Sequence, residues 1–516
     1  MILVVDFGGQ TAHLISRRIK EFGVETKMVS PEDAYETIVK ESPSSAKASA
    51  GKPKGIILSG GPSSVYEKGA PTIDKRIFDL GIPILGICYG LQLTAYLLGG
   101  DVKKARIRED GPATLKLNIS CPLFTSVSQH SRIWMSHGDE VLTPPPKFSF
   151  IGESETIRGA AIANEKRKIY GVQFHPEVEH TEHGNLILRN FIEKICNIPT
   201  KKQTLKIEAM VENLKKTIGK YRAIAAVSGG LDSTVAATLT AKAIGQNLIP
   251  IHVESGLMRE GTTAKVVKFF TKKLHIKAII LRKEKEFLLA LKGKTDPEEK
   301  RKAIGKLYID LFQEECKKYR NVKFLVQGTI YSDVIESKGT KHAANIKSHH
   351  NVGGLPQSLK LTLIEPIRHL YTDQVRSLAK KLGIPDEIIT EQPHPGPGYA
   401  IRILGEVTHR RLTIMQKADN IVIEELKRFG WYDKLLHSFP VLTGVKSTSV
   451  KGDGRVYGEV MAIRAVTSTD RMTADWAKLP RELLQKLTSR ITNEIPEISR
   501  VVYDITTKPP ATMEWE

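Results

Sequence analysis

Short apolar runs alternate with amphipathic, helix-like stretches along most of the chain. The run at residues 2–7 leads into a pattern of apolar residues at helical spacing that ends near Gly23. The further apolar runs are residues 55–58, 82–87, 169–174, 223–227, 248–254, 277–281 and 322–329. Because strands that alternate with helices build parallel sheets covered on both faces, the pattern predicts an α/β fold with two doubly wound domains, each holding a mostly parallel sheet.

The pattern changes twice, and each change marks a candidate domain boundary. Residues 197–202 read Asn-Ile-Pro-Thr-Lys-Lys, which is typical of a linker. From about Arg402, a long helical pattern and a strand-like run at 460–466 predict a small α+β domain. The predicted domains are therefore 1–199, 200–401 and 402–516. The run SPSSAKASAGKP at residues 42–53 is small, polar and proline-bearing, which is typical of a flexible surface insertion.

A glycine-rich loop joins the apolar run at 223–227 to a helical pattern that includes Val235. Its glycines let the backbone turn sharply and approach a ligand, and the free N–H groups at the start of a helix favour an anion. No lysine follows the second glycine, so the loop is not the common Gly-x-x-x-x-Gly-Lys phosphate loop. The candidate ATP-binding residues are Ser228, Gly229, Gly230, Leu231, Asp232 and Ser233.

Asp232 indicates what kind of anion this loop suits. A carboxylate repels phosphate unless a cation lies between them, so we expect a Mg²⁺ that accompanies ATP and contacts Asp232. Such a loop suits pyrophosphate held as a leaving group, which means attack on the α-phosphate of ATP. An ordinary glycine-rich turn between a strand and a helix is the alternative.

Cys88 ends the apolar run at 82–87, within the sequence Gly-Ile-Cys-Tyr-Gly, and an apolar helical pattern follows it. The order of strand, nucleophile and helix, with flanking glycines, is that of a nucleophile elbow with Cys in the Ser position. The N-terminus of a helix lowers the pKa of a thiol and so favours the thiolate. His175 follows the strand at 169–174, and Glu177 can orient it, so Cys88 gains a candidate base. A buried structural cysteine is the alternative.

The same region offers donors for a developing oxyanion. Backbone N–H groups near Gly61, which follows the strand at 55–58, and at Tyr89 suit that role. Gln92 is expected to face the same pocket from one turn into the helix. Residues 136–139 read Ser-His-Gly-Asp and are interpreted as a polar turn without an assigned role.

Composition narrows the classes of function. The formal net charge is +20, but the basic residues are spread along the chain without an aromatic RNA-binding signature, which disfavours a nucleic-acid partner. The four cysteines form no Cys-x-x-Cys pair, which fits a reducing, cytoplasmic setting. No stretch approaches 18 apolar residues, and the first residues lack the basic start of a signal peptide, so we expect no membrane partner.

Two blocks give the first part of the chain a specific resemblance. The sequence around Cys88 and the His-Pro-Glu at 175–177 resemble the class I, or triad, glutamine amidotransferases over residues 1–199. In that family the Cys attacks the side-chain amide of glutamine, releases ammonia and leaves a thioester for water to hydrolyse. The resemblance implies Cys88 as the nucleophile, His175 as acid and base, and Glu177 as the group that orients His175.

The loop at 228–233 is similar to that of the PP-loop ATP pyrophosphatases, and longer blocks narrow the resemblance. These blocks are residues 327–337, 346–356, 395–398, 499–504 and 508–516. With the amidotransferase in front, the chain resembles the glutamine-hydrolysing GMP synthetases over essentially its full length. That family implies the substrates xanthosine monophosphate (XMP), ATP and glutamine, Mg²⁺ with ATP, no tightly bound organic cofactor, and a homodimer formed through the last domain.

The family also implies roles that the residues alone indicate only weakly. The lid expected to close over ATP comprises Asp333, Glu336, Lys338, Lys347, His349 and His350. The residues expected to bind XMP are Arg259, Lys508 and Glu514, the last two on a docked tail. One departure lies near the loop: the family usually has Asp-Asn-Gly where residues 254–256 read Glu-Ser-Gly. Glu254 keeps the charge but is one methylene longer, which bears on the contacts with adenosine.

Two other functions compete with this interpretation. A PP-loop enzyme that modifies tRNA would need a cysteine pair or an RNA-binding appendage, and the sequence shows neither. A non-catalytic nucleotide-binding protein on the same scaffold would be expected to lack Cys88, His175 or Asp232, and all three are present.

Overall fold

The computed structural model describes residues 1–516 except 10, 41–52, 119, 202–205, 332, 335–360, 469–472 and 509. Most of the insertion predicted at 42–53 therefore lies outside the described residues. The chain divides into two compact units, the first built from Met1–Thr204 and the second from most of the chain between Leu205 and Glu516. None of the helices within the described ranges combines the length and apolar character needed to cross a membrane.

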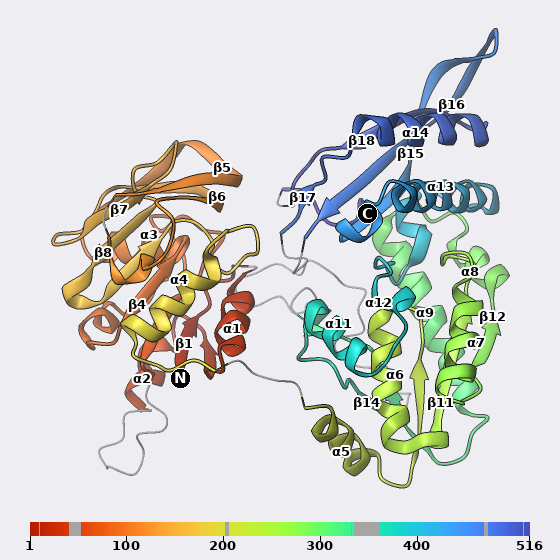
Figure 1. Ribbon diagram of the computed structural model, residues 1–516, viewed down its shortest axis with the longest axis horizontal. Helices are drawn as coiled ribbons and strands as arrows, with labels where there is room; N and C mark the ends of the chain where they lie inside the picture. Colours follow the sequence, from red (N-terminus) through yellow and green to blue (C-terminus); the bar gives the residue numbers. More distant parts are fainter. Residues whose placement is uncertain are drawn as a thin grey trace. The chain divides into compact units, whose positions relative to one another are not determined.

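In the described part of the first unit, nine strands form one sheet in the order β2-β1-β3-β4-β9-β8-β7-β5-β6. Figure 1 labels β1, β4, β5, β6, β7 and β8 of this sheet. The strands from β2 to β9 in this order pair in parallel, and those from β9 to β6 pair antiparallel. The strands are β1 (Ile2–Val5), β2 (Thr26–Val29), β3 (Gly55–Leu58), β4 (Ile84–Ile87), β5 (Asp101–Leu117), β6 (His130–Thr143), β7 (Ser149–Glu153), β8 (Ala161–Asn164) and β9 (Ile169–Val172). The predicted α/β class is confirmed, with an antiparallel extension that the apolar runs did not indicate.

Helices cover the parallel part of this sheet. They are α1 (Ala12–Glu21), α2 (Ala34–Lys40), α3 (Tyr89–Leu97) and α4 (Gly184–Asn190), with shorter turns η1 (Lys75–Asp79), η2 (Pro122–Phe124), η3 (Glu165–Arg167) and η4 (Phe191–Ile195). Helix α1 ends as the sequence predicts, because Gly23 just beyond it has φ +75°, a conformation that favours glycine. Basic residues in its last turn, Arg18 and Lys20, complement the helix dipole.

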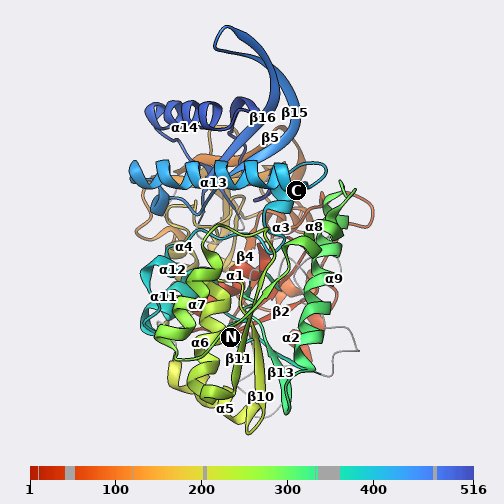
Figure 2. The same cartoon turned by 90° about the vertical axis from the view of Figure 1, so that its right-hand side faces the viewer.

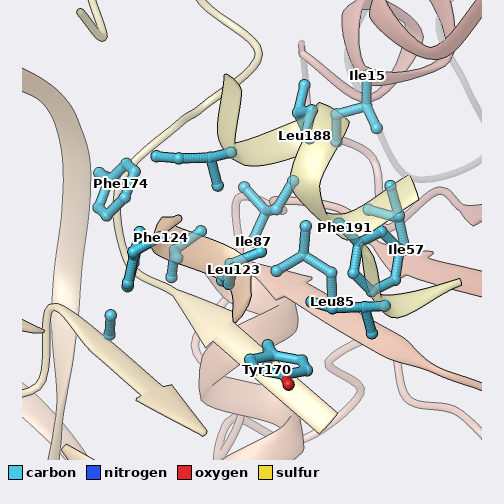
Figure 3. Packing of buried hydrophobic residues seen from close by; sticks show 14 of the residues in the cluster. Ile15, Ile57, Leu85, Ile87, Leu123, Phe124, Tyr170, Phe174, Leu188 and Phe191 are labelled. Carbon is cyan, nitrogen blue, oxygen red and sulfur yellow. The ribbon is translucent and has the colours of Figure 1, made fainter. Parts of the chain in front are cut away.

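The core of the first unit supports the strand ends where chemistry is expected. Ile57, Leu85, Ile87 and Tyr170 come from neighbouring parallel strands and pack together with Phe191 (Figure 3). Burial of each such side chain contributes about 1.5–3 kcal/mol. The same cluster includes both the Cys88 side chain and the residue that precedes His175, so the candidate catalytic residues are anchored in packed core.

In the second unit, the described residues form a five-stranded, all-parallel sheet in the order β12-β11-β10-β13-β14. Its strands are β10 (Arg222–Ala226), β11 (Leu248–Glu254), β12 (Ile279–Arg282), β13 (Val322–Val326) and β14 (Thr362–Ile364). Its helices and helical turns are α5 (Ile207–Ile218), α6 (Leu231–Ile244), η5 (Gly245–Asn247), α7 (Thr262–Lys273), α8 (Glu284–Leu291), α9 (Pro297–Cys316), α11 (Thr372–Lys381), α12 (Asp386–Ile389) and η6 (Gly398–Arg402). Strands β11 and β12 follow one another on one side of the central strand β10, and β13 and β14 follow one another on its other side. Ligands of open α/β sheets bind at the carboxyl ends of the strands at such a topological switch point.

The last part of the second unit adds a smaller sheet, which for the described residues has four strands. They are β15 (His437–Lys451), β16 (Gly454–Thr467), β17 (Asp475–Trp476) and β18 (Ile498–Asp504), accompanied by α13 (His409–Arg428), η7 (Tyr432–Lys434) and α14 (Arg481–Glu494). The tip of the β15–β16 hairpin extends beyond α14 (Figure 2). Residues of α8, such as Phe287, share a buried cluster with Met415 of α13 and Met461 of β16. The smaller sheet therefore packs onto the same unit as the parallel one.

The interpretation of residues 136–139 as a turn is wrong, because these residues lie inside strand β6. Ser136 is opposite Asp110 of β5, and its hydroxyl donates to that carboxylate over 2.9 Å. His137 Nε2 lies 2.8 Å from Glu109 Oε2 on the same neighbouring strand. The polarity that suggested a turn thus belongs to a hydrogen-bonded pair of strands.

Candidate active sites

Cys88 occupies a strained turn between strand β4 and helix α3. Its φ is +51°, which is unusual for a residue with a side chain, and the helix begins at the next residue. A Cβ on Gly86 would lie 2.5 Å from Gly90 O, and one on Gly90 would lie 2.2 Å from Leu58 O. Both glycines are therefore required by close backbone contacts, as the elbow pattern predicts.

His175 and Glu177 stand next to this turn and are joined to each other. His175 Nδ1 lies 2.7 Å from Glu177 Oε1, so the carboxylate fixes the ring and leaves Nε2 for proton transfer. The ring also hydrogen-bonds with Cys88. A Cβ on Gly60 would lie 3.2 Å from His175 Cε1 and 3.7 Å from Cys88 Cβ, so Gly60 faces both residues. The structure thus brings the three predicted catalytic residues together.

Electrostatics favour a charged imidazole at this site. Burial of His175 alone would lower its pKa, but the Glu177 carboxylate and the hydrogen bond with Cys88 outweigh burial and raise the pKa well above its ordinary value. Glu177 is completely buried, and its partner is His175. A charged imidazole at this position has a proton to give to a leaving group.

Two contacts of the Cys88 sulfur involve residues that the sequence reasoning missed. The sulfur lies 3.5 Å from the carbonyl oxygen of Ser136, and Gln173 Nε2 donates to it over 3.6 Å. Gln92 does not reach the sulfur directly, since its amide donates to Gln173 Oε1 and to the Asp139 carbonyl. Gln173 precedes His175 by two residues, and the alternation of side chains along an extended chain was the signal that could have placed both on one side.

Gly61 and Tyr89, the candidates for the oxyanion site, are packed against each other. A Cβ on Gly61 would lie 3.3 Å from Tyr89 Cγ and 3.0 Å from the carbonyl oxygen of Phe7. The Tyr89 hydroxyl donates to Pro71 O over 2.5 Å, and burial raises the pKa of Tyr89 to about 12. The Tyr89 side chain is thus part of the core, and the backbone N–H is the group suited to an oxyanion.

The glycine-rich loop of the second unit has the predicted strand–loop–helix form, with Gly230 as the cap of α6. Ser228 Oγ lies 3.0 Å from Ser233 Oγ, and that hydroxyl also accepts from the Ser228 backbone N–H over 3.3 Å. Thr234 Oγ1 donates to Gly230 O over 2.8 Å. The loop hydroxyls therefore contact one another at the open end of the helix, where backbone N–H groups favour an anion.

Neighbouring segments hold this loop closely. Gly229 has φ +91°, and a Cβ there would lie 2.7 Å from a Thr262 methyl group. A Cβ on Gly328, just after β13, would lie 2.5 Å from Ser233 N. His252 of β11, which sequence reasoning missed, lies with Nδ1 2.8 Å from Val227 O, immediately before the loop. Burial lowers the pKa of His252, so it acts here as a neutral hydrogen-bond donor to the backbone.

Of the residues predicted for the lid, Asp333 is described, and its carboxylate accepts from the Ile330 N–H over 3.1 Å. It is buried, at 8% exposure, and has helical conformation in the segment after β13. The other predicted lid residues, Glu336, Lys338, Lys347, His349 and His350, lie outside the described residues.

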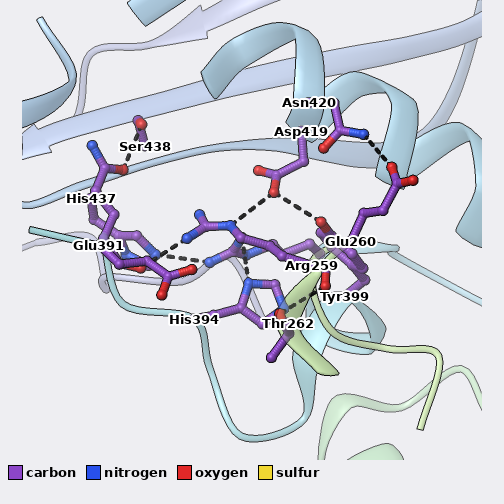
Figure 4. A network of polar contacts seen from close by, with 12 residues as sticks. Arg259, Glu260, Thr262, Glu391, His394, Tyr399, Asp419, Asn420, His437 and Ser438 are labelled. Carbon is purple, nitrogen blue, oxygen red and sulfur yellow. Dashed lines mark hydrogen bonds and ion pairs between the residues drawn. The ribbon is translucent and has the colours of Figure 1, made fainter. Parts of the chain in front are cut away.

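Arg259, a residue predicted to bind XMP, lies in a buried polar network (Figure 4). Its Nε donates to Asp419 Oδ2 over 3.0 Å, and its Nη1 donates to the Gln392 carbonyl over 2.8 Å. The Tyr399 hydroxyl donates to the same Asp419 oxygen over 2.8 Å. His394 lies with Nε2 3.3 Å from Leu257 O, and its pKa is lowered well below the ordinary value by burial and by nearby guanidinium groups.

The C-terminal tail is docked, as its prolines and aromatic residue predicted. Met513 is 8% exposed, and Lys508 pairs through its backbone with Ala474. Glu514 forms an ion pair with Arg402, whose Nη2 lies 3.0 Å from Glu514 Oε1. Lys508, Glu514 and Arg259 all belong to the second unit.

Glu254 and Ser255, which stand where the family usually has Asp and Asn, both make local contacts. Glu254 ends β11 and lies 3.5 Å from Arg282 Nε of the neighbouring strand. Ser255 is fully buried, and its hydroxyl accepts from Leu257 N over 3.3 Å. Both residues thus make contacts that shape the end of the strand.

The chain resembles known proteins over its full length. Residues 3–195 match the family model "Glutamine amidotransferase class-I", and residues 424–515 match "GMP synthase C terminal domain". The chain is 50% identical to "GMP synthase [glutamine-hydrolyzing]" of Caldanaerobacter subterraneus, over 100% of this chain and 99% of that one. It is 48% identical to the protein of the same name from Aquifex aeolicus, over the same shares. A solved glutamine amidotransferase from Thermotoga maritima is 20% identical, covers 38% of this chain and 97% of its own, and has a TM-score of 0.30.

The fold and site of the first unit define a class I glutamine amidotransferase. Because the chain is 48–50% identical to these proteins over its full length, it belongs to the glutamine-hydrolysing GMP synthase family.

Proposed function

We propose that this chain makes GMP from XMP, ATP and glutamine, with AMP, pyrophosphate and glutamate as the other products. The observation that carries the proposal is that one chain of this family holds both a hydrogen-bonded Cys-His-Glu set and a glycine-rich loop that begins a helix at a topological switch point. A glutaminase alone would not need the second site, and an ATP-cleaving enzyme alone would not need the first.

In the first half-reaction the Cys88 thiolate attacks the side-chain amide carbon of glutamine. The backbone N–H groups near Gly61 and Tyr89 stabilise the oxyanion of the tetrahedral intermediate. His175 gives its proton to the leaving nitrogen, so ammonia departs and a thioester remains. His175 then takes a proton from water, which attacks the thioester and releases glutamate.

In the second half-reaction the 2-oxygen of XMP attacks the α-phosphate of ATP, and pyrophosphate leaves. The loop at residues 228–233 holds the leaving group through its backbone N–H groups and hydroxyls. Ammonia then attacks C2 of the adenylyl-XMP and displaces AMP, which yields GMP. Arg259, Lys508 and Glu514 are the groups assigned to XMP, and the six predicted lid residues are assigned to ATP.

A Mg²⁺ that accompanies ATP fits the loop. Mg²⁺ at such sites is commonly held by one or two carboxylates together with substrate phosphates, and Asp232 in the first turn of α6 supplies one carboxylate. Among the described residues, no cluster of three or more His, Cys, Asp or Glu side chains could hold a metal. The cation is therefore assigned to the ATP complex, where it would neutralise charge on the departing pyrophosphate.

The remaining expectations complete the proposal. The three-domain division at residues 1–199, 200–401 and 402–516 assigns glutamine hydrolysis, ATP cleavage, and dimer formation with XMP binding to successive parts of the chain. A cytoplasmic homodimer without a nucleic-acid partner follows from the family and from the scattered basic residues.

The test is release of pyrophosphate from ATP by the purified full-length chain, with and without XMP, in the presence of ammonium. Release that depends on XMP, together with formation of GMP, is the expected result. ATP cleavage that is indifferent to XMP, or the absence of cleavage, would overturn the assignment.

A further inference from the structure

Three cationic side chains with no exposed surface surround the C-terminal segment from Asp504 to Glu516. They are Lys300 of α9, Arg402 of η6 and Arg464 of β16. Arg464 donates to the backbone carbonyls of Thr512 and Met513 over 2.8 and 3.1 Å. A buried charge is costly unless it is paired and hydrogen-bonded. The C-terminal segment supplies acceptors for these cations, and the cations in turn hold the segment in place.

Arg402 binds the carboxylate of Glu514 through two parallel hydrogen bonds. Its Nε donates to Oε2 over 3.1 Å, and its Nη2 donates to Oε1 over 3.0 Å. The guanidinium lies over the ring of Phe439, 4.2 Å from its centroid, and Nη2 is 2.8 Å from His437 Nε2. The contacts with Phe439, His437 and Glu514 together hold the Arg402 guanidinium in one orientation. Because its two parallel hydrogen bonds lie in one plane, they also fix the orientation of the Glu514 carboxylate.

Lys300 fixes the same segment two residues further on. Its ammonium donates to Glu516 Oε2 over 2.7 Å, and to the carbonyls of Ala400 and Ile403 over 3.2 and 2.7 Å. Those two carbonyls flank Arg402, so Lys300 binds the segment that carries Arg402 as well as the tail. Trp515, between the two glutamates, is 39% exposed. The acidic side chains thus turn inward at alternate positions, each to its own cation.

We propose that Arg402 and Lys300 are positioning residues for the XMP half-reaction, because together they fix the direction of the Glu514 carboxylate. The proposal rests on the function given above, in which Glu514 contacts XMP. Each carboxylate oxygen has more than one lone pair, so the Arg402 pair leaves acceptor sites for a nucleotide hydroxyl or N–H. What Arg402 removes is rotation of the carboxylate, and a misplacement of about 1 Å at a reacting complex can cost about 100-fold in rate.

The central test is Arg402→Lys in the full-length chain, assayed for GMP formation with ammonium as the nitrogen source. Lysine keeps the charge but cannot form the two parallel bonds. We expect KM for XMP to rise by about 10- to 100-fold, with a much smaller change in KM for ATP. The same substitution in a Glu514→Gln background should add little, because Arg402 acts through Glu514.

Lys300→Met provides a second variant if Arg402→Lys fails to fold, and Glu516→Gln is its partner. The expected result is again a rise in KM for XMP, with non-additive effects in the double variant. Lys302→Met is the matched control, because Lys302 is on the same helix with its side chain 76% exposed and should leave KM for XMP unchanged. Folded variants with the KM of the unchanged protein, or effects that add fully in the doubles, would overturn the proposal. If the protein without substitutions releases no pyrophosphate in the presence of XMP, that result would instead overturn the function on which the proposal rests.

Discussion

The two active sites differ in how much of each is assembled by the protein alone. In the first unit Glu177 bonds to His175, His175 bonds to Cys88, and all three are at most 7% exposed. In the second unit Ser228 and Ser233 are at the surface end of a helix and bond to each other. The difference follows from the chemistry: the nucleophile of the first reaction is a protein group and must be held in place, whereas both reactants of the second are substrates.

This comparison predicts that small changes disrupt the first site more than the second. The largest effect is expected for Glu177→Gln, which keeps the shape but removes the charge that raises the pKa of His175. Glutaminase activity should fall by about 10²- to 10⁴-fold, because burial then favours a neutral imidazole that has no proton to give to the leaving nitrogen. Release of ammonia from glutamine measures the loss, and a fall of less than tenfold would contradict the role given to Glu177.

The effect of Glu177→Gln on the free energy of unfolding should depend on pH. The folded-state pKa of His175 is raised, so its proton stabilises the first unit below the unfolded value of 6.5, and this contribution is lost as pH rises through the folded-state pKa. In Glu177→Gln burial lowers the pKa instead, so the variant should lose most stability relative to the unchanged protein on the acid side of 6.5. Denaturant titrations at two pH values measure this, and a larger loss on the alkaline side would contradict the assigned charge.

Gly60→Ala tests how closely the first site is packed. The added Cβ would lie 3.2 Å from His175 Cε1, so the ring must shift by a few tenths of an ångström. Glutaminase activity should fall by about 100-fold, since misplaced catalytic groups lose rate steeply. Gly305→Ala, whose Cβ would meet nothing within 4 Å, is the control. Equal effects of the two substitutions would contradict the close packing at Gly60.

Ser233→Ala makes the corresponding change in the second site. It removes a hydroxyl that contacts Ser228 and, in the proposed complex, the pyrophosphate. GMP formation with ammonium should fall by about 10-fold, because backbone N–H groups of the loop still hold the anion, and glutaminase activity measures whether the first unit is intact. A loss as severe as that of Glu177→Gln would show that this loop is no more tolerant than the triad.

Tyr89→Phe should have the smallest effect. It removes the hydrogen bond to Pro71 O, which is worth about 1 kcal/mol of stability, but leaves the backbone N–H assigned to the oxyanion. A drop in glutaminase activity of more than tenfold, at a thermal midpoint close to that of the unchanged protein, would mean that the hydroxyl takes part in catalysis.

The sequence predicted what is local in both sites. Glycines around Cys88 and in the 228–233 loop indicated sharp turns after strands, and the turns are present. It could not show which distant side chains meet, because helical and strand patterns carry no information about partners far along the chain. Asp419 pairs with Arg259 across 160 residues, and Arg402 pairs with Glu514 across 112. Strand β6 was missed for the same reason, since the polar residues 136–139 are explained by their partners on β5.

In the proposed function, ammonia links a cysteine glutaminase to an ATP-dependent synthetase within one chain. The direct measurement is GMP formation by Cys88→Ala, first with glutamine and then with ammonium as the nitrogen donor. We expect no synthesis from glutamine, but synthesis from ammonium at close to the rate of the protein without the substitution. Loss of both in a folded variant, or continued synthesis from glutamine, would contradict it.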